Sequence, residues 1–157
     1  MKLFCDDTSY DFSEEELESM YVDEGEEGII YRYGDKAFKV YKPYCYKTRM
    51  KEDTCQQFLQ TRIPTKRVLL PQSLLRSEDY SFIGYTTPFI VGGPPRVLLS
   101  LKVPDFMNKI DEVYDDLYLL ADHHVLVYDL IYSNSCYDGK NGLYFVDPGS
   151  YEFDSKR

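Results

Sequence analysis

The chain has 157 residues, the size of a single ordinary domain, and carries 18 basic against 27 acidic side chains. The formal charge of −9 argues against a general nucleic-acid binder or a protein of anionic membrane surfaces, because both need a basic face. Hydrophobic residues make up 43% of the chain and aromatic residues 16%, so a core can form and disorder throughout is excluded.

The N-terminal residues turn acidic at Asp6 and Asp7 without an apolar signal core, and no apolar run reaches the roughly 18 residues of a membrane span. The cysteines are scattered and form no C-x-x-C motif: Cys5, Cys45, Cys55 and Cys136. We therefore expect a cytoplasmic protein with free thiols, without a zinc site or a disulfide framework.

The N-terminal half predicts a short helix followed by strands. Ser13 and Glu16 have the spacing of a capping box, which favours a short acidic helix. Helix formers predict a second helix over residues 46–61. Apolar and aromatic runs bounded by turn residues predict strands over residues 28–33, 36–41, 67–70 and 81–90.

The C-terminal half predicts one long helix and a small β-unit. Residues 92–95, Gly-Gly-Pro-Pro, must form an irregular connection and are the best candidate hinge. The long helix is expected over 104–123, where apolar residues recur at steps of three and four: Phe106, Ile110, Val113, Leu117 and Leu120. His123 and His124 would cap its C-terminal end. Short buried strands are expected at 125–127 and 143–146, linked as a hairpin.

Lys39 lies inside a predicted strand with apolar or aromatic neighbours. A strand lysine usually faces solvent, and that reading needs no function. A functional lysine needs a carboxylate that holds it as a fixed charge for phosphate oxygens, and Glu52 on the next helix could supply this carboxylate.

Gly25 and Gly28 precede the first of these strands, in an acidic stretch. Two glycines three residues apart permit a tight backbone with amide groups turned towards an anion. A hairpin turn explains them equally well, and the glutamates at 24, 26 and 27 would repel a phosphate.

Asp129, Asn134 and Asp147 each follow a short apolar strand or lie close beyond one. Taken singly, such residues most often just open turns. Taken together they offer a carboxylate that can orient or deprotonate a hydroxyl, and an Asn–Asp pair of oxygen ligands for a hard cation.

The order of these residues resembles the protein-kinase-like fold over residues 21–153, and in particular short kinase-like proteins of bacteria. The resemblance implies an α+β architecture: a twisted antiparallel N-lobe sheet with one helix, in residues 1–91, and a minimal C-lobe with the long helix and a catalytic-loop β-hairpin, in residues 92–157. It also implies ATP and Mg²⁺ as cofactors.

The resemblance assigns one role to each candidate residue. Phosphates are positioned by Lys39 and the backbone at Gly25 and Gly28, while Glu52 orients Lys39. Asp129 matches the catalytic aspartate, and the metal ligands match Asn134 and Asp147.

The chain also departs from the kinase pattern. Asp23 stands where a loop glycine is expected, Val127 and Tyr128 replace the His-Arg before the catalytic aspartate, and Pro148 replaces the phenylalanine of Asp-Phe-Gly. Ile131 stands where protein Ser/Thr kinases favour a lysine. The sequence continues for only ten residues after Asp147, so we expect no activation segment and no helical substrate platform.

The sequence therefore predicts an ATP- and Mg²⁺-dependent phosphotransferase whose acceptor is a small molecule or is presented by a partner protein that completes the C-lobe. An exposed apolar patch beside the 104–123 helix would favour the partner protein. The alternative is a pseudokinase-like module that binds nucleotide or a partner without transferring phosphate. A purely structural domain without a ligand is a third interpretation.

Overall fold

The structure, a computed structural model, describes residues 1–45 and 49–155. The chain forms two compact units: unit 1 comprises residues 1–60 and 71–89, and unit 2 comprises residues 61–70 and 90 onwards. Segment 61–70 belongs to unit 2, where its backbone N–H groups bond to Asp116 and Phe145.

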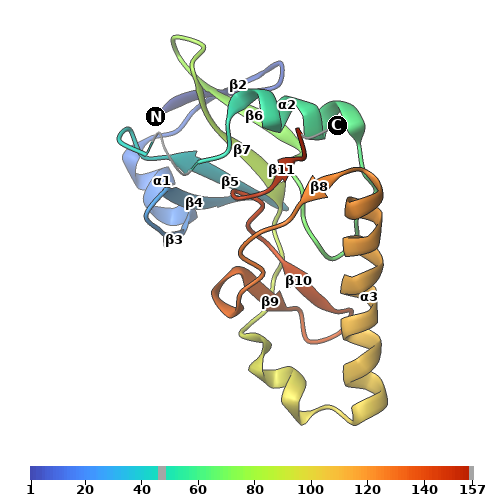
Figure 1. The fold of residues 1–157 in the computed structure, drawn as a ribbon. Helices are drawn as coiled ribbons and strands as arrows, with labels where there is room; N and C mark the ends of the chain where they lie inside the picture. The colour runs from blue at the N-terminus through green and yellow to red at the C-terminus, as the bar shows by residue number, and fades with distance from the viewer. Residues whose placement is uncertain (46–48, 156–157) are drawn as a thin grey trace. The chain divides into compact units, whose positions relative to one another are not determined.

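Unit 1 is built on a seven-stranded antiparallel curled sheet in the order β2-β1-β6-β7-β5-β4-β3 (Figure 1). Its strands are β1 (Lys2–Cys5), β2 (Thr8–Asp11), β3 (Tyr21–Glu24), β4 (Gly28–Tyr33), β5 (Lys36–Tyr41), β6 (Ser73–Ser77) and β7 (Phe82–Pro88). The predicted strands 28–33 and 36–41 are confirmed as β4 and β5, and the strand predicted at 81–90 is confirmed as β7. No expectation covered β1, β2, β3 or β6.

The two helices of unit 1 are α1 (Glu14–Met20) and α2 (Glu52–Thr61). The predicted capping box of α1 is confirmed: the Ser13 side chain accepts from the Glu16 backbone N–H, and the Glu16 side chain accepts from that of Ser13. The second helix is shorter than the predicted 46–61, since it begins at Glu52. Residues 46–48 of that prediction lie outside the described residues.

One face of the sheet carries the main hydrophobic core of unit 1. Phe38 of β5 and Leu75 of β6 are almost fully buried there, and rings from β2 and the following loop pack around Phe38. Side chains alternate across a strand, so Lys39 points to the opposite face from Phe38 and shares that face with Tyr85 of β7.

Unit 2 contains the long helix α3 (Val103–Asp122), which confirms the helix predicted over 104–123 (Figure 1). Val113 and Leu120 on its predicted apolar face are buried. His123 ends the helix, and its ring Nδ1 lies 2.9 Å from the Leu119 carbonyl oxygen, as a C-terminal cap does. Before α3, residues 92–94 form an irregular connection to the short 3₁₀ helix η1 (Pro95–Ser100).

The β-structure of unit 2 consists of very short strands: β8 (Val125–Leu126), β9 (Ser135–Tyr137), β10 (Leu143–Phe145) and β11 (Glu152–Phe153), with the 3₁₀ helix η2 (Tyr132–Asn134) before β9. β10 pairs with β9, and β8 pairs with β11. The expected hairpin between 125–127 and 143–146 is therefore wrong, because each of these segments finds a different partner. The strand expected at 67–70 is also wrong: only Val68 forms an isolated bridge, to Phe145.

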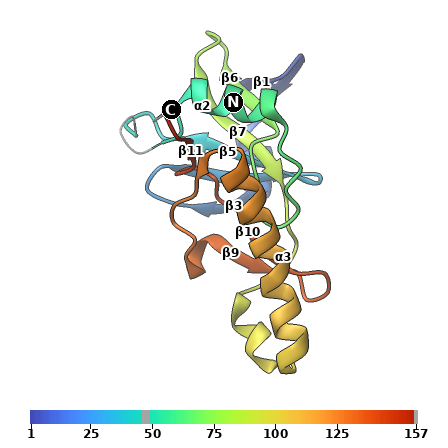
Figure 2. The ribbon, with the colours of Figure 1, turned by 45° about the vertical axis from the view of Figure 1, so that its right-hand side comes forward.

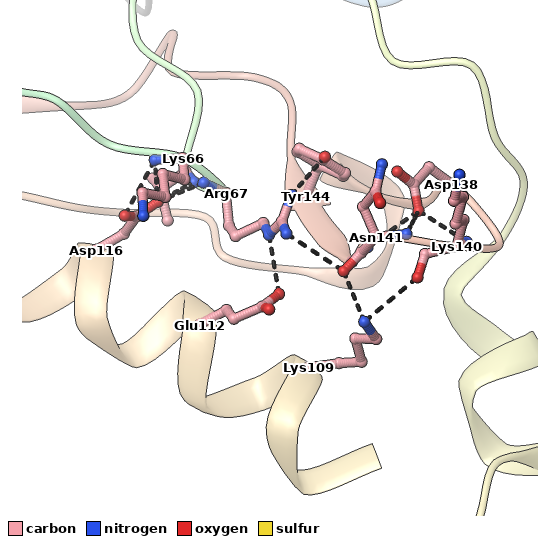
Figure 3. A network of polar contacts seen from close by, with 11 residues as sticks. Lys66, Arg67, Lys109, Glu112, Asp116, Asp138, Lys140, Asn141 and Tyr144 are labelled. Atoms are coloured by element: carbon pink, nitrogen blue, oxygen red, sulfur yellow. Dashed lines mark hydrogen bonds and ion pairs between the residues drawn. The ribbon is translucent and has the colours of Figure 1, made fainter. Parts of the chain in front are cut away.

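A network of side chain-to-backbone bonds holds segment 61–70 in unit 2 (Figure 3). The buried Asp116 of α3 accepts the backbone N–H groups of Lys66, Arg67 and Val68, at 2.8 Å for Val68. Arg67 donates from Nε to Glu112 at 2.9 Å and also bonds the hydroxyl of Tyr144 on β10. This network fixes β10 and hence the segment that leads to Asp147.

The part of the chain that the structure describes contains no helix long and apolar enough to cross a membrane. No disulfide joins cysteines within the described ranges.

Candidate functional site

Lys39 lies on β5, an inner strand with β4 on one side and β7 on the other. Its side chain is not solvent-facing, since only 6% of the residue is exposed. The ammonium Nζ lies 3.1 Å from Oε2 of Glu27 and 5.9 Å from the centroid of the Tyr85 ring. A lysine this buried needs a carboxylate, and Glu27 provides one.

The ion pair expected between Lys39 and Glu52 is replaced by two other pairs. Glu52, the first residue of α2, forms a salt bridge with Arg76 of β6 and accepts from the Gln56 side chain at 3.2 Å. Lys39 instead meets Glu27, which directly precedes β4, the strand paired with β5. The register of the hairpin brings Glu27 to the lysine, whereas the start of α2 lies against the strand that carries Arg76.

Gly25 lies in the turn between β3 and β4, and Gly28 is the first residue of β4. The Gly25 N–H donates to the Gly28 carbonyl at 3.0 Å. Gly28 is required by close packing, because a Cβ there would lie 2.5 Å from the Val40 carbonyl oxygen. Gly25 has open space around its Cα. The turn is a hairpin, and Gly25 rather than Gly28 is the position where a ligand could come close to the backbone.

Lys42 completes the charge balance of this turn, with its Nζ 2.6 Å from Oε1 of Glu24. Lys42 thus pairs with the last residue of β3, and Lys39 pairs with Glu27 of the turn. Any phosphate that binds here must compete with Glu27 for Lys39.

In unit 2, Asp129 and Asn134 are held together directly. The Asn134 side-chain Nδ2 donates to the Asp129 carbonyl at 3.0 Å. Asp129 has φ +57°, a left-handed conformation that is costly for a residue other than glycine and is concentrated at functional sites. The Asp129 carbonyl also accepts from the Ile131 N–H at 2.8 Å, so a tight loop presents the exposed Asp129 carboxylate.

A backbone hydrogen bond brings the segment that carries Asp147 next to Asn134. The Val146 N–H donates to the Asn134 carbonyl at 2.9 Å, which places the residue before Asp147 against Asn134. The half-buried Asp147 carboxylate accepts from the Gly149 N–H at 3.0 Å.

Tyr151 is a buried phenol of the same segment, and its backbone N–H donates to the Pro148 carbonyl at 3.0 Å. Burial raises the pKa of its hydroxyl well above the usual range, and the negative charges of Asp147 and Asp129 raise it further. The hydrogen bonds from Asn134 to Asp129 and from Val146 to Asn134 bring together, within unit 2, the segments that carry the predicted trio of Asp129, Asn134 and Asp147.

These side chains suit a hard cation. Asn134 commits its amide nitrogen to the Asp129 carbonyl, which leaves the amide oxygen as its ligand atom, and Asp147 adds a carboxylate. Mg²⁺ takes oxygen ligands and keeps several waters, so two protein ligands suffice when phosphates supply others. Among the described residues no group of three or more His, Cys, Asp or Glu side chains could hold a metal by itself.

Sequence reasoning missed Glu27 and Tyr151. We expected Glu27 to repel phosphate. It directly precedes β4, the strand paired with β5, so the expected hairpin could have indicated that Glu27 lies near Lys39. Tyr151 follows Asp147-Pro148-Gly149 closely, but an aromatic residue near a turn carries no specific signal. Cys136 lies near Asn134 in sequence, and burial followed by the charge of Asp138 raises the pKa of its thiol, so it is a poor nucleophile.

Comparison with known proteins identifies no relative: neither the family models nor the curated protein sequences that were searched contain a match.

Proposed function

We propose that the chain is a protein-kinase-like phosphotransferase that uses ATP and Mg²⁺. The observation that carries the proposal is the cluster of Asp129, Asn134 and Asp147 in unit 2, joined by the Asn134–Asp129 and Val146–Asn134 hydrogen bonds. A structural turn needs one such residue, whereas here the left-handed Asp129 is joined by the amide of Asn134 and the carboxylate of Asp147.

The buried Lys39 of unit 1 supports the same proposal. A fixed cation on an inner strand is suited to phosphate oxygens, and a ligand could approach the backbone of the neighbouring turn at Gly25, where the space is open. In this proposal Glu27 takes the place that the resemblance assigned to Glu52, because it is the carboxylate in contact with Lys39.

Asn134 and Asp147 would hold Mg²⁺, which would supply charge neutralisation at the phosphates when bound. Asp129 orients the acceptor hydroxyl and accepts its proton as that oxygen bonds to the γ-phosphorus and the bond to the ADP oxygen breaks. The contribution of the protein is then positioning and charge stabilisation rather than covalent chemistry.

The second candidate function is a pseudokinase-like module that binds nucleotide without transfer. The specific observation in its favour is the Glu52–Arg76 pair, because it draws Glu52 away from Lys39. The contact between Lys39 and Glu27 also has to yield or rearrange for a phosphate to bind.

Titration calorimetry of ATP with and without Mg²⁺, followed by a γ-phosphate transfer assay, tests the proposal. Asp147→Ala should abolish the Mg²⁺-dependent part of the ATP affinity. Asp129→Asn should keep the ATP affinity within a few-fold but lower turnover by about 10²-fold, the usual scale for a lost acid–base group. Asp122→Asn, an exposed carboxylate on α3, is the matched control and should change neither quantity.

Lys39→Ala examines unit 1 separately, with Lys36→Ala on the same strand as its control. If Lys39 holds phosphate oxygens, Lys39→Ala should weaken ATP binding while Lys36→Ala leaves the ATP affinity within a few-fold. Binding without autophosphorylation, transfer or ATP hydrolysis would favour the pseudokinase-like module. Absence of any ATP binding by the wild-type chain would overturn both candidate functions.

A further inference from the structure

Unit 1 contains a cavity that neither candidate function uses. It has a volume of about 680 Å³ and lies where the end of β5 and the start of β7 meet the residues that lead into α2 (Figures 1 and 2). A cavity of this size falls within the range of small-molecule sites, about 300–1,000 Å³. Lys39 is not among the described residues that line it.

The inner wall of the cavity is aromatic. Tyr41 and Phe82 are 6% and 9% exposed, and their rings meet edge to face with centroids 5.8 Å apart. The Tyr41 hydroxyl donates to the Met50 carbonyl at 3.4 Å, which helps to fix the orientation of the ring. A molecule that enters the cavity therefore meets aromatic carbon, which favours an apolar or aromatic body.

Two cationic side chains also line the cavity. Arg49 is half-buried, and its Cζ lies 5.2 Å from the centroid of the Tyr41 ring. Lys51, which directly precedes α2, is exposed at the opening. A guanidinium group has five N–H donors and an ammonium group has three, so each can bind an anionic oxygen while it keeps other partners.

The single carboxylate among the described lining residues belongs to Glu52. The salt bridge to Arg76 balances its charge, so the charge that remains at the cavity is that of Arg49 and Lys51. This local excess of positive charge lies in a chain with a formal charge of −9. It favours an anion over a cation as the ligand.

We propose that this cavity binds a small organic anion, with an aromatic body against Tyr41 and Phe82 and a carboxylate or phosphate group held by Arg49 and Lys51. The aromatic wall supplies most of the contact area, and the two cations select the charge of the ligand. This proposal is independent of phosphoryl transfer.

An NMR titration of the full ¹⁵N-labelled chain tests the cavity. Phenyl phosphate or benzoate should shift the backbone signals of the lining residues with a dissociation constant in the millimolar range, as expected for a ligand of about ten non-hydrogen atoms. The tighter of the two identifies the preferred anionic group. Inorganic phosphate and phenol each lack one half of the ligand and should bind at least about fivefold more weakly. The proposal is overturned if neither aromatic anion shifts these signals, or if inorganic phosphate binds as tightly.

Variants of the two cations locate the anionic group. Arg49→Gln should weaken the binding of the preferred anion by about tenfold, and Lys51→Gln should weaken it by a few-fold. Lys36→Gln, on β5 but outside the described lining, is the matched control and should leave the affinity unchanged. Lys39→Ala should also keep this affinity within a few-fold, so the proposed function and the cavity can fail separately. Equal affinities for the wild type and Arg49→Gln, in variants whose amide spectra show a retained fold, would overturn the assignment.

Discussion

Units 1 and 2 are stabilised in different ways. Unit 1 has strands of four to seven residues and a core in which Phe38 and Leu75 are 1% and 0% exposed. The strands of unit 2 have two or three residues, so they make few ladder bonds. In unit 2, buried or half-buried carboxylates stabilise the irregular backbone. Asp116 accepts three backbone N–H groups, and Asp138 Oδ1 accepts the N–H groups of residues 140–142 (Figure 3).

The difference shows where the chemistry can reside. A sheet with a continuous apolar core fixes its backbone without polar side chains, and it can hold a buried cation such as Lys39 on its other face. The loops of unit 2 need polar clamps to keep irregular backbone in place, because irregular segments lack mutual hydrogen bonds. The same loops carry Asp129, Asn134 and Asp147.

The largest effect is expected from Asp116→Ala. The change leaves the backbone N–H groups of residues 66–68 without their acceptor, at a cost of about 4 kcal/mol in the free energy of unfolding. Urea denaturation measures the loss. Asp115→Ala, an exposed neighbour on α3, should cost no more than about 0.5 kcal/mol. A loss below about 1 kcal/mol for Asp116→Ala would contradict the claim that carboxylate-to-backbone hydrogen bonds stabilise unit 2.

Leu75→Ala makes the corresponding change in unit 1. Leu75 is fully buried, so the lost transfer free energy and the cavity together should lower stability by about 3 kcal/mol. Val22→Ala on the exposed edge strand β3 is the control and should have little effect in the same urea series. Equal losses for the two variants would show that the apolar core is not what holds the sheet.

Thr86→Val should stabilise unit 1 by about 1 kcal/mol. Thr86 is fully buried on β7, and its Oγ1 has no hydrogen-bond partner among the described residues, so the hydroxyl carries an uncompensated desolvation cost. Ser73 lies opposite it on β6 and donates to Asp6 at 2.8 Å. Ser73→Ala should therefore change the thermal midpoint in the opposite direction.

The smallest effect concerns acid stability. Burial by itself raises the pKa of Asp138, but the three N–H donors of residues 140–142 and the charge of Arg67 outweigh it and hold the pKa below 3.8. The stabilisation from a depressed pKa is complete above the unfolded value and is lost as pH falls through the folded one. Asp138→Asn should therefore flatten the fall of the thermal midpoint below about pH 4. Asp7→Asn, in an exposed loop, should leave that slope unchanged.

Local patterns predicted the elements whose signals are local. Ser13 and Glu16 predicted the capping box of α1, apolar and aromatic runs over 28–33 and 36–41 predicted β4 and β5, and apolar periodicity predicted α3. Strands β1 and β2 escaped prediction because each has only four residues and its residues are mixed in character. Residues 67–70 have the composition of a strand, but Asp116 captures their backbone N–H groups.

The sequence by itself determined which residue types are available for chemistry: a lysine within a strand, and Asp129, Asn134 and Asp147 close after short apolar segments. Only the tertiary structure decided the partners. From the sequence, either Glu27 or Glu52 could pair with Lys39. The β4–β5 register places Glu27 in contact with Lys39, and Glu52 forms a salt bridge with Arg76 instead. Ion pairs depend on positions in space, and residues distant in sequence set those positions.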